Sequence, residues 1–147
     1  MKLTKNISFF IVIAIIITLI GKALESKFLF IYLKQNITGL LLTLLAINTA
    51  TSGLIASKIQ DIVVKYPQIN FSITIDQMKR SLLEQIILII VSVITLLLMD
   101  SAKIIYEFKD IVGNTILTAV LIYAVNILWD TGKGVFVIIE ELQKMNN

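Results

Sequence analysis

Apolar residues along the chain gather into four long stretches separated by charged segments. The stretches cover residues 7–21, 37–57, 82–99 and 111–129, and only the third contains a charge, Glu84. A helix needs about 20 apolar residues to cross the hydrocarbon core of a bilayer. The first stretch is short, but lysines at its two ends can extend its reach by snorkelling. We therefore predict an all-α polytopic membrane protein, with four transmembrane helices in an antiparallel bundle.

Composition supports a single membrane domain over residues 1–147. Hydrophobic residues make up 57% of the chain, and the mean hydropathy is +0.91. A soluble domain of this length is nearer half apolar and has little interior in which to hide an excess. The N-terminus resembles a signal peptide, with Lys2 and Lys5 before an apolar run, but no small-x-small cleavage site follows it. We interpret the run as a retained first span.

The distribution of basic residues predicts the topology. With the N-terminus inside, eight basic residues lie on the inner side: Lys2, Lys5, Lys58, Lys65, Lys79, Arg80, Lys133 and Lys144. Five lie outside: Lys22, Lys27, Lys34, Lys103 and Lys109. The positive-inside rule then favours both termini in the cytoplasm, with the chain in the inner (cytoplasmic) membrane, over the inverted arrangement.

The segment between the second and third spans predicts a helical hairpin that extends into the cytoplasm. Apolar residues keep helical spacing up to Tyr66, and Pro67 ends the helix. Thr74 and Gln77 have the spacing of a capping box, which predicts a helix from about Ile75 to Phe108. Apolar and polar residues alternate over 71–75, a weak indication of a short strand.

Small residues form a stripe along the second span. They recur three or four positions apart and fall within about 80° of helix arc: Gly39, Thr43, Ala46, Ala50, Gly53 and Ser57. Small residues let helix backbones approach closely in lipid. We expect this helix to be central, and the stripe to contact either a neighbouring span or another subunit. A homo-oligomer, either a dimer or a tetramer, follows from the second alternative.

Polar residues lie on one side of three of the predicted spans. The predicted polar interior consists of Asn48, Thr51, Ser52, Ser92, Thr95, Thr118 and Asn126. A buried amide without a partner costs a few kcal/mol, on the order of the penalty for any unpaired polar group in hydrocarbon. These side chains therefore either bond between helices or line a wet cavity or pore.

The chain lacks the residues that most enzymes need. Histidine and cysteine are both absent, which removes the commonest general base and the thiolate nucleophile. No charge lies in the middle of a span, unlike in a small drug/proton antiporter, and Glu84 has the spacing to pair with Arg80. We expect no enzymatic activity, cofactor, metal or direct nucleic-acid contact.

The hairpin is the predicted docking surface for a cytoplasmic protein. Its candidate contacts are Lys65, Tyr66, Phe71, Lys79 and Arg80. Apolar residues without a domain to bury them indicate an interaction site. The alternative is that they pack against the other arm of the hairpin or enter the headgroup layer.

The run from Leu45 to Gly53, continuing through Lys58 to Asp61, prompts a family comparison. With its bare four-span architecture, the chain resembles small membrane subunits of bacterial anti-phage defence systems, such as that of the Kiwa system. The resemblance implies an oligomeric membrane sensor that works with a separate cytoplasmic effector. Besides membrane lipids, the expected partners are thus further copies and one cytoplasmic protein. Two functions remain open: a non-enzymatic scaffold or sensor, and a holin-like or channel-type pore former.

Overall fold

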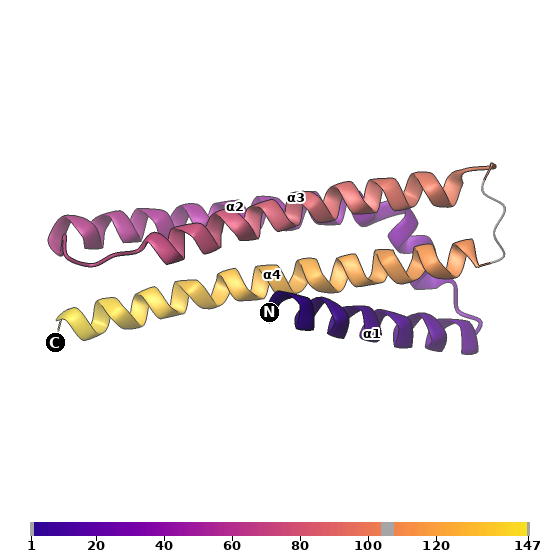
Figure 1. Ribbon diagram of the computed structural model, residues 1–147, viewed down its shortest axis with the longest axis horizontal. Coiled ribbons are helices and arrows are strands. Elements are labelled where there is room, and N and C mark those ends of the chain that lie inside the picture. The colour runs from indigo at the N-terminus through magenta and orange to yellow at the C-terminus, as the bar shows by residue number, and fades with distance from the viewer. Residues whose placement is uncertain (1, 104–107, 147) are drawn as a thin grey trace.

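The chain folds into four helices, as the computed structural model shows for residues 2–103 and 108–146. They are α1 (Lys2–Ala23), α2 (Phe28–Lys65), α3 (Ser72–Asp100) and α4 (Lys109–Asn146), running alternately in opposite directions (Figure 1). The prediction of an all-helical chain is confirmed. Three helical segments are long and apolar enough to span a membrane: Phe28–Lys65, Ser72–Asp100 and Lys109–Val137. The described part of α1 adds the shorter apolar stretch Ser8–Ala23.

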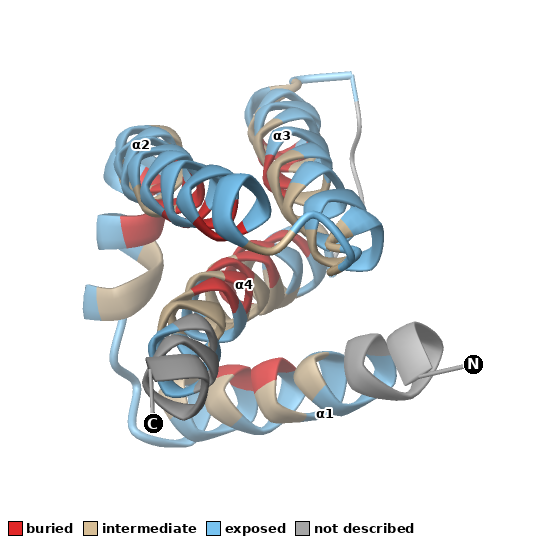
Figure 2. Cartoon of the chain, turned by 90° about the vertical axis from the view of Figure 1, so that its left-hand side faces the viewer, coloured by how far each residue is buried: buried red, intermediate tan, exposed pale blue. Residues whose placement is uncertain are grey.

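Helix α4 is the centre of the bundle. It packs against each of the other three helices, while α2 and α3 also pack against each other. Figure 2 shows α4 in the middle, with α1 on one side and the α2–α3 pair on the other. The expectation that the second span would be central is therefore wrong. The side of α2 that carries its small residues is exposed, whereas α4 packs against three helices and carries Leu117, Val120, Ala124 and Ile127 in the main core.

Two contacts fix how α1 lies along α4. The rings of Phe10 and Tyr123 are 5.6 Å apart, and the hydrogen-bonded hydroxyl oxygens of Thr18 and Thr115 are 3.2 Å apart. Equal numbers of residues separate the two contacts on the two helices, so the pair is antiparallel and in register. Continued in this register, α1 begins level with Thr131. Figure 1 accordingly shows the N-terminus near the middle of the long axis.

Beyond the start of α1 the bundle continues as three helices, which we call the projection (residues 49–83 and 131–146). It has a core of its own, made of Ile55, Ile59 and Ile62. Tyr66 and Phe71 are packed against this core. The apolar residues of the hairpin thus partly bury one another, as one of the two sequence-based alternatives predicts.

The turn between α2 and α3 differs from its prediction. Helix α2 ends at Lys65 before Pro67, as expected, but α3 begins at Ser72 and not near Ile75. The side chain of Asn70 accepts a hydrogen bond from the Ser72 amide at 2.8 Å, so Thr74 is not a cap. The strand indicated over 71–75 is also wrong, because helical geometry turns Phe71 and Met78 together onto the projection core. At its other end α3 stops at Asp100, before Phe108.

The turn between α1 and α2 forces one residue into a left-handed conformation. Glu25 has a φ of 51°. Its amide bonds to the Lys22 carbonyl at 3.1 Å, and the Ser26 amide bonds to the Gly21 carbonyl at 2.9 Å. This is the Schellman pattern, in which the left-handed position is usually glycine. A glutamate there costs on the order of 1 kcal/mol.

Candidate functional site

A buried cluster of amides and hydroxyls joins three helices at the base of the projection. The Asn48 Nδ2 group of α2 donates to Ser81 Oγ at 2.8 Å and to Gln85 Oε1 at 2.9 Å, both on α3. Ser81 Oγ is 3.1 Å from Thr131 Oγ1 on α4. The Thr131 hydroxyl donates to the Ile127 carbonyl, so Ser81 is the donor to Thr131. A directed relay of hydrogen bonds thus ties α2 to α3 and α3 to α4.

The cluster is not fully satisfied. Asn48 Oδ1, Gln85 Nε2 and the neighbouring Ser52 Oγ are buried without a hydrogen-bond partner among the described residues. Turning both amides round would only exchange the atoms that lack a partner. Unpaired polar atoms in a protein interior cost about 1–3 kcal/mol each. The cluster therefore specifies how the helices align more than it adds to stability.

A polar pocket of about 630 Å³ opens directly above the cluster. Its volume lies within the range of about 300–1,000 Å³ that is usual for small-molecule sites. Helices α2, α3 and α4 contribute its lining: Ile55, Thr74, Gln77, Met78, Arg80, Ser81, Glu84, Ile127, Asp130, Thr131 and Gly134. Ser81 and Thr131 belong to both the pocket and the cluster, so the two form one continuous polar site.

Glu84 is the least exposed charge in this site. Its side chain is 19% exposed, against 61% for Arg80, whose Nε donates to Glu84 Oε1 at 3.0 Å. The Tyr123 hydroxyl donates to the second oxygen, Oε2, at 2.8 Å. The pairing of Glu84 with Arg80 follows from the four-residue spacing. The link to Tyr123 does not, because Tyr123 lies 39 residues away, on another helix.

A second charged group lies on α4. Asp130 Oδ1 is 2.7 Å from Lys133 Nζ, and Asp130 Oδ2 accepts from Asn126 Nδ2 at 3.2 Å. Lys133 Nζ also lies 5.9 Å from the centre of the Trp129 ring. A tryptophan beside a lysine at the end of an uncharged stretch is typical of a membrane–water interface. The polar site therefore lies at the level where we expect the bilayer to end.

Most of the predicted polar interior is buried but does not connect helices. Ser92, Thr95 and Thr118 are buried, and each hydroxyl donates to a backbone carbonyl of its own helix. The half-buried Thr51 does the same. Asn126 is half-buried and bonds Asp130 in its own helix. Of the predicted set, only Asn48 bonds across helices, to Ser81 and Gln85. Those two residues and Thr131 were outside the predicted set, although Ser81 and Gln85 share the four-residue spacing of a helix face.

The small-residue stripe of α2 lies on the outer surface. All six residues are exposed: Gly39, Thr43, Ala46, Ala50, Gly53 and Ser57. A Cβ atom added at Gly39 or Gly53 would meet nothing within 4 Å. The interpretation of the stripe as a contact between spans of one chain is therefore wrong. Its interpretation as a subunit interface stays a prediction.

The five predicted docking residues fall into three settings. Lys65 is exposed near the tip, and Lys79 is exposed beside Asp76 at 3.9 Å. Tyr66 and Phe71 are half-buried on the projection core. Arg80 lines the polar pocket. The most exposed apolar side chains near the tip are others, Val64 at 76% and Ile73 at 74%.

Comparison with protein-family models, curated proteins and solved structures finds no match to this chain. Its class therefore rests on the fold: an all-helical chain with three helices able to span a membrane. Among the described residues, no three acidic, histidine or cysteine side chains are grouped to hold a metal ion. The site consists of fixed opposite charges over a polar floor, an arrangement suited to binding a polar or zwitterionic group.

Proposed function

We propose that this protein is a non-enzymatic, oligomeric membrane scaffold or sensor subunit that recruits or regulates a cytoplasmic protein. The observation that carries the proposal is the projection, in which three helices continue past the start of α1 with a core of their own. Val64 and Ile73 stay exposed beside that core. Apolar side chains held outward by a rigid support, away from lipid, favour protein contact.

We further propose four spans with both termini in the cytoplasm of the cell and the chain in its inner membrane. The 22 residues of α1 would extend about 33 Å, close to the hydrocarbon thickness of a bilayer. Because α1 begins at the base of the projection, the N-terminus and the projection share one side. The excess of basic residues predicted for that side supports the cytoplasmic assignment.

Oligomerisation is part of the same proposal. The outward stripe of α2 offers a surface without large side chains, where a second copy can approach closely. Closed cyclic symmetry then predicts a dimer or a tetramer. By its resemblance to membrane subunits of anti-phage systems, the recruited protein would be a defence effector.

A pore-forming role finds less support. The half of the bundle away from the projection is filled by a continuous apolar core that includes Leu33, Ile37, Leu41, Met99 and Leu117. A conducting pathway through one subunit would need polar groups along this length. A pore formed between several copies is the alternative, and a conductance assay in liposomes separates it from the scaffold.

The recruitment test uses the product of a neighbouring gene as the candidate partner. Val64→Asp with Ile73→Asp should abolish its co-purification, while Gln60→Asp, at an exposed polar site of the projection, should not. Both variants should insert into the membrane normally, because neither site is part of a core. Equal recovery of the partner with both variants would contradict the proposed docking surface.

A further inference from the structure

A lateral groove opens between α1 and α3, with α4 as its floor. It has a volume of about 290 Å³, and its walls include Phe10 and Ile11 of α1, Leu88 and Val91 of α3, and Ala119 of α4. Helix α1 packs on α4, and α1 and α3 are not among the helix pairs with substantial contact. Figure 2 shows the two helices on separate sides of α4.

The groove lies in the part of the chain that we place in hydrocarbon. Its α3 and α4 residues belong to the uncharged stretches 85–99 and 111–129, and its lining is almost entirely apolar. An apolar groove facing lipid is filled by lipid chains unless a protein covers it, because nothing else in the bilayer core is available to pack there.

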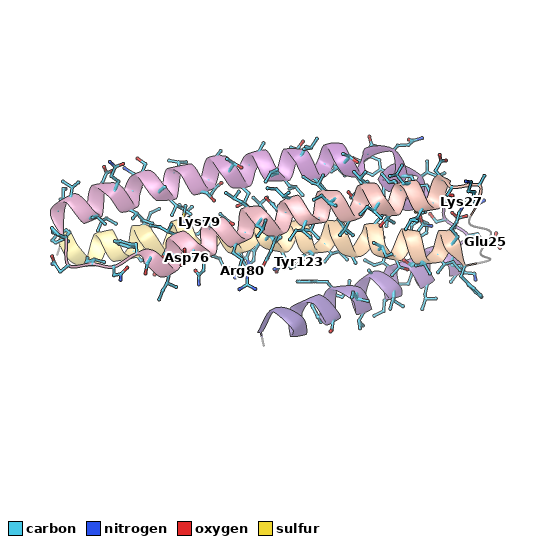
Figure 3. All side chains as sticks on the ribbon, turned by 45° about the horizontal axis from the view of Figure 1, so that its top comes forward. Glu25, Lys27, Asp76, Lys79, Arg80 and Tyr123 are labelled. Carbon is cyan, nitrogen blue, oxygen red and sulfur yellow. The ribbon has the colours of Figure 1, made fainter. Side chains whose placement is uncertain are left out.

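One hydrogen bond joins the groove to the polar pocket. The Tyr123 ring is part of the groove wall, and its hydroxyl donates to Glu84 Oε2 at 2.8 Å. Glu84 in turn lines the pocket. Figure 3 shows Tyr123 and Arg80 close together along the edge of the bundle near the start of α1. The apolar groove and the polar pocket thus meet at the level where we expect the acyl chains of the bilayer to end and the headgroups to begin.

The charges of the pocket have a definite pattern. Arg80 uses Nε to bind Glu84, and its two Nη groups have no hydrogen-bond partner among the described residues. A guanidinium with free N–H groups fits a phosphate. Glu84 and Asp130 line the same pocket, and carboxylate oxygens accept several hydrogen bonds each. The lining of the pocket therefore contributes one cation and two carboxylates, and Asp130 is also paired with Lys133 beside the pocket.

We propose that the groove and the pocket together bind one glycerophospholipid with a primary-amine headgroup, of the phosphatidylethanolamine type. An acyl chain lies in the groove past Tyr123, the phosphate meets the Arg80 Nη groups, and the ammonium donates to Glu84 and Asp130. A choline headgroup carries a cation without N–H groups and cannot make these hydrogen bonds. A glycerol headgroup brings no cation for the carboxylates. The inference does not depend on the cytoplasmic partner proposed above.

The test measures lipid binding to the full-length, delipidated protein in detergent by native mass spectrometry. Phosphatidylethanolamine, phosphatidylcholine and phosphatidylglycerol with identical acyl chains are titrated separately. We expect one ethanolamine lipid to bind at least about tenfold more tightly than the other two, the difference that one charge-assisted hydrogen bond makes. Equal affinities, tighter binding of the glycerol lipid, or no binding of any of the three would overturn the proposal.

Variants of the protein then distinguish the contribution of the lipid headgroup to binding from that of the acyl chain. Glu84→Gln combined with Asp130→Asn should remove the preference for ethanolamine over choline, and Arg80→Gln should weaken both. Ala119→Phe fills the groove and should weaken all three lipids. The matched controls are Asp76→Asn on the same face of the projection and Val125→Phe on the exposed side of α4.

The proposed site would also be refuted if the preference for the ethanolamine lipid survived the loss of both carboxylates, or if Ala119→Phe left the affinity for all three lipids unchanged. Should the double carboxylate variant fail to fold, the comparison of the three lipids on the unmodified chain and on Ala119→Phe still decides.

Discussion

Asn48→Ala should destabilise the bundle more than any other single loss of a polar side chain in α2. Asn48 is fully buried and donates both hydrogens of its amide to α3. Hydrogen bonds between membrane helices contribute about 0.6 kcal/mol each on average. The substitution also leaves the Gln85 carbonyl oxygen buried without a donor, which costs about 1–3 kcal/mol. Loss of the unpartnered Asn48 Oδ1 offsets part of this, so we expect a net loss of about 2 kcal/mol.

A double-mutant cycle with Gln85→Ala sharpens this prediction. Each single variant strands one member of the amide pair, whereas the double variant strands neither. The double variant should therefore lose about 1 kcal/mol less than the sum of the two single variants. If the two substitutions were independent, their effects would simply add.

The free energy of unfolding can be measured by circular dichroism in mixed micelles with a rising fraction of denaturing detergent. Thr49→Ala is the matched control, because Thr49 is exposed and its hydroxyl bonds only the Leu45 carbonyl of its own helix. We expect this control to unfold within about 0.5 kcal/mol of the unmodified chain. The role of the amide pair would be refuted if Asn48→Ala had the same free energy of unfolding as the control, or if the effects of the two single variants simply added in the double variant.

Three further predictions concern substitutions that introduce or replace a glycine. Glu25→Gly should raise the free energy of unfolding by on the order of 1 kcal/mol in the same assay, because glycine adopts the left-handed conformation without strain; unchanged stability would mean that the glutamate relieves the strain elsewhere. Gly113→Ala should lower it by about 1–3 kcal/mol through overpacking, since the new methyl group meets the buried Met99 side chain; in a Met99→Ala background the same substitution should cost less, because the side chain that it meets is gone. Gly53→Leu should leave the fold intact but shift the mass in nanodiscs toward the monomer, and an unchanged oligomer would show that the stripe is not a subunit interface.

The sequence predicts the helices well because the features that define a helix, its apolar length and the residues that end it, lie within one stretch of the chain. Four apolar stretches of near-membrane length became four helices, and Pro67 ended α2 because proline cannot continue a helix. The start of α3 was missed since the Asn70 side chain accepts a hydrogen bond from the Ser72 amide and so starts the helix ahead of the apolar run. No end was predicted for α4, because hydropathy falls beyond Trp129 while the helix continues into the projection.

The site was harder to predict because it depends on which helix faces which. A threonine such as Thr118 satisfies its hydroxyl on its own backbone, so its polarity says nothing about a neighbour. A small residue such as Gly53 suits a close contact with a span of the same chain as well as one with another subunit. Glu84 illustrates the same limit: spacing identified Arg80, but only the fold brought Tyr123 to the other oxygen.

The length of α4 has a mechanical consequence. Its 38 residues form one helix, about 57 Å long, that runs from the far end of the bundle to the end of the projection. Since α4 is also the packing partner of every other helix, it can act as a lever that pivots at its start, the end away from the projection. Tilting a rod of this length by about 5° about one end moves the other end by about 5 Å, nearly one helical turn. A change in bilayer thickness that tilts the spans would therefore reach the tip of the projection as a displacement, with no hinge needed in between.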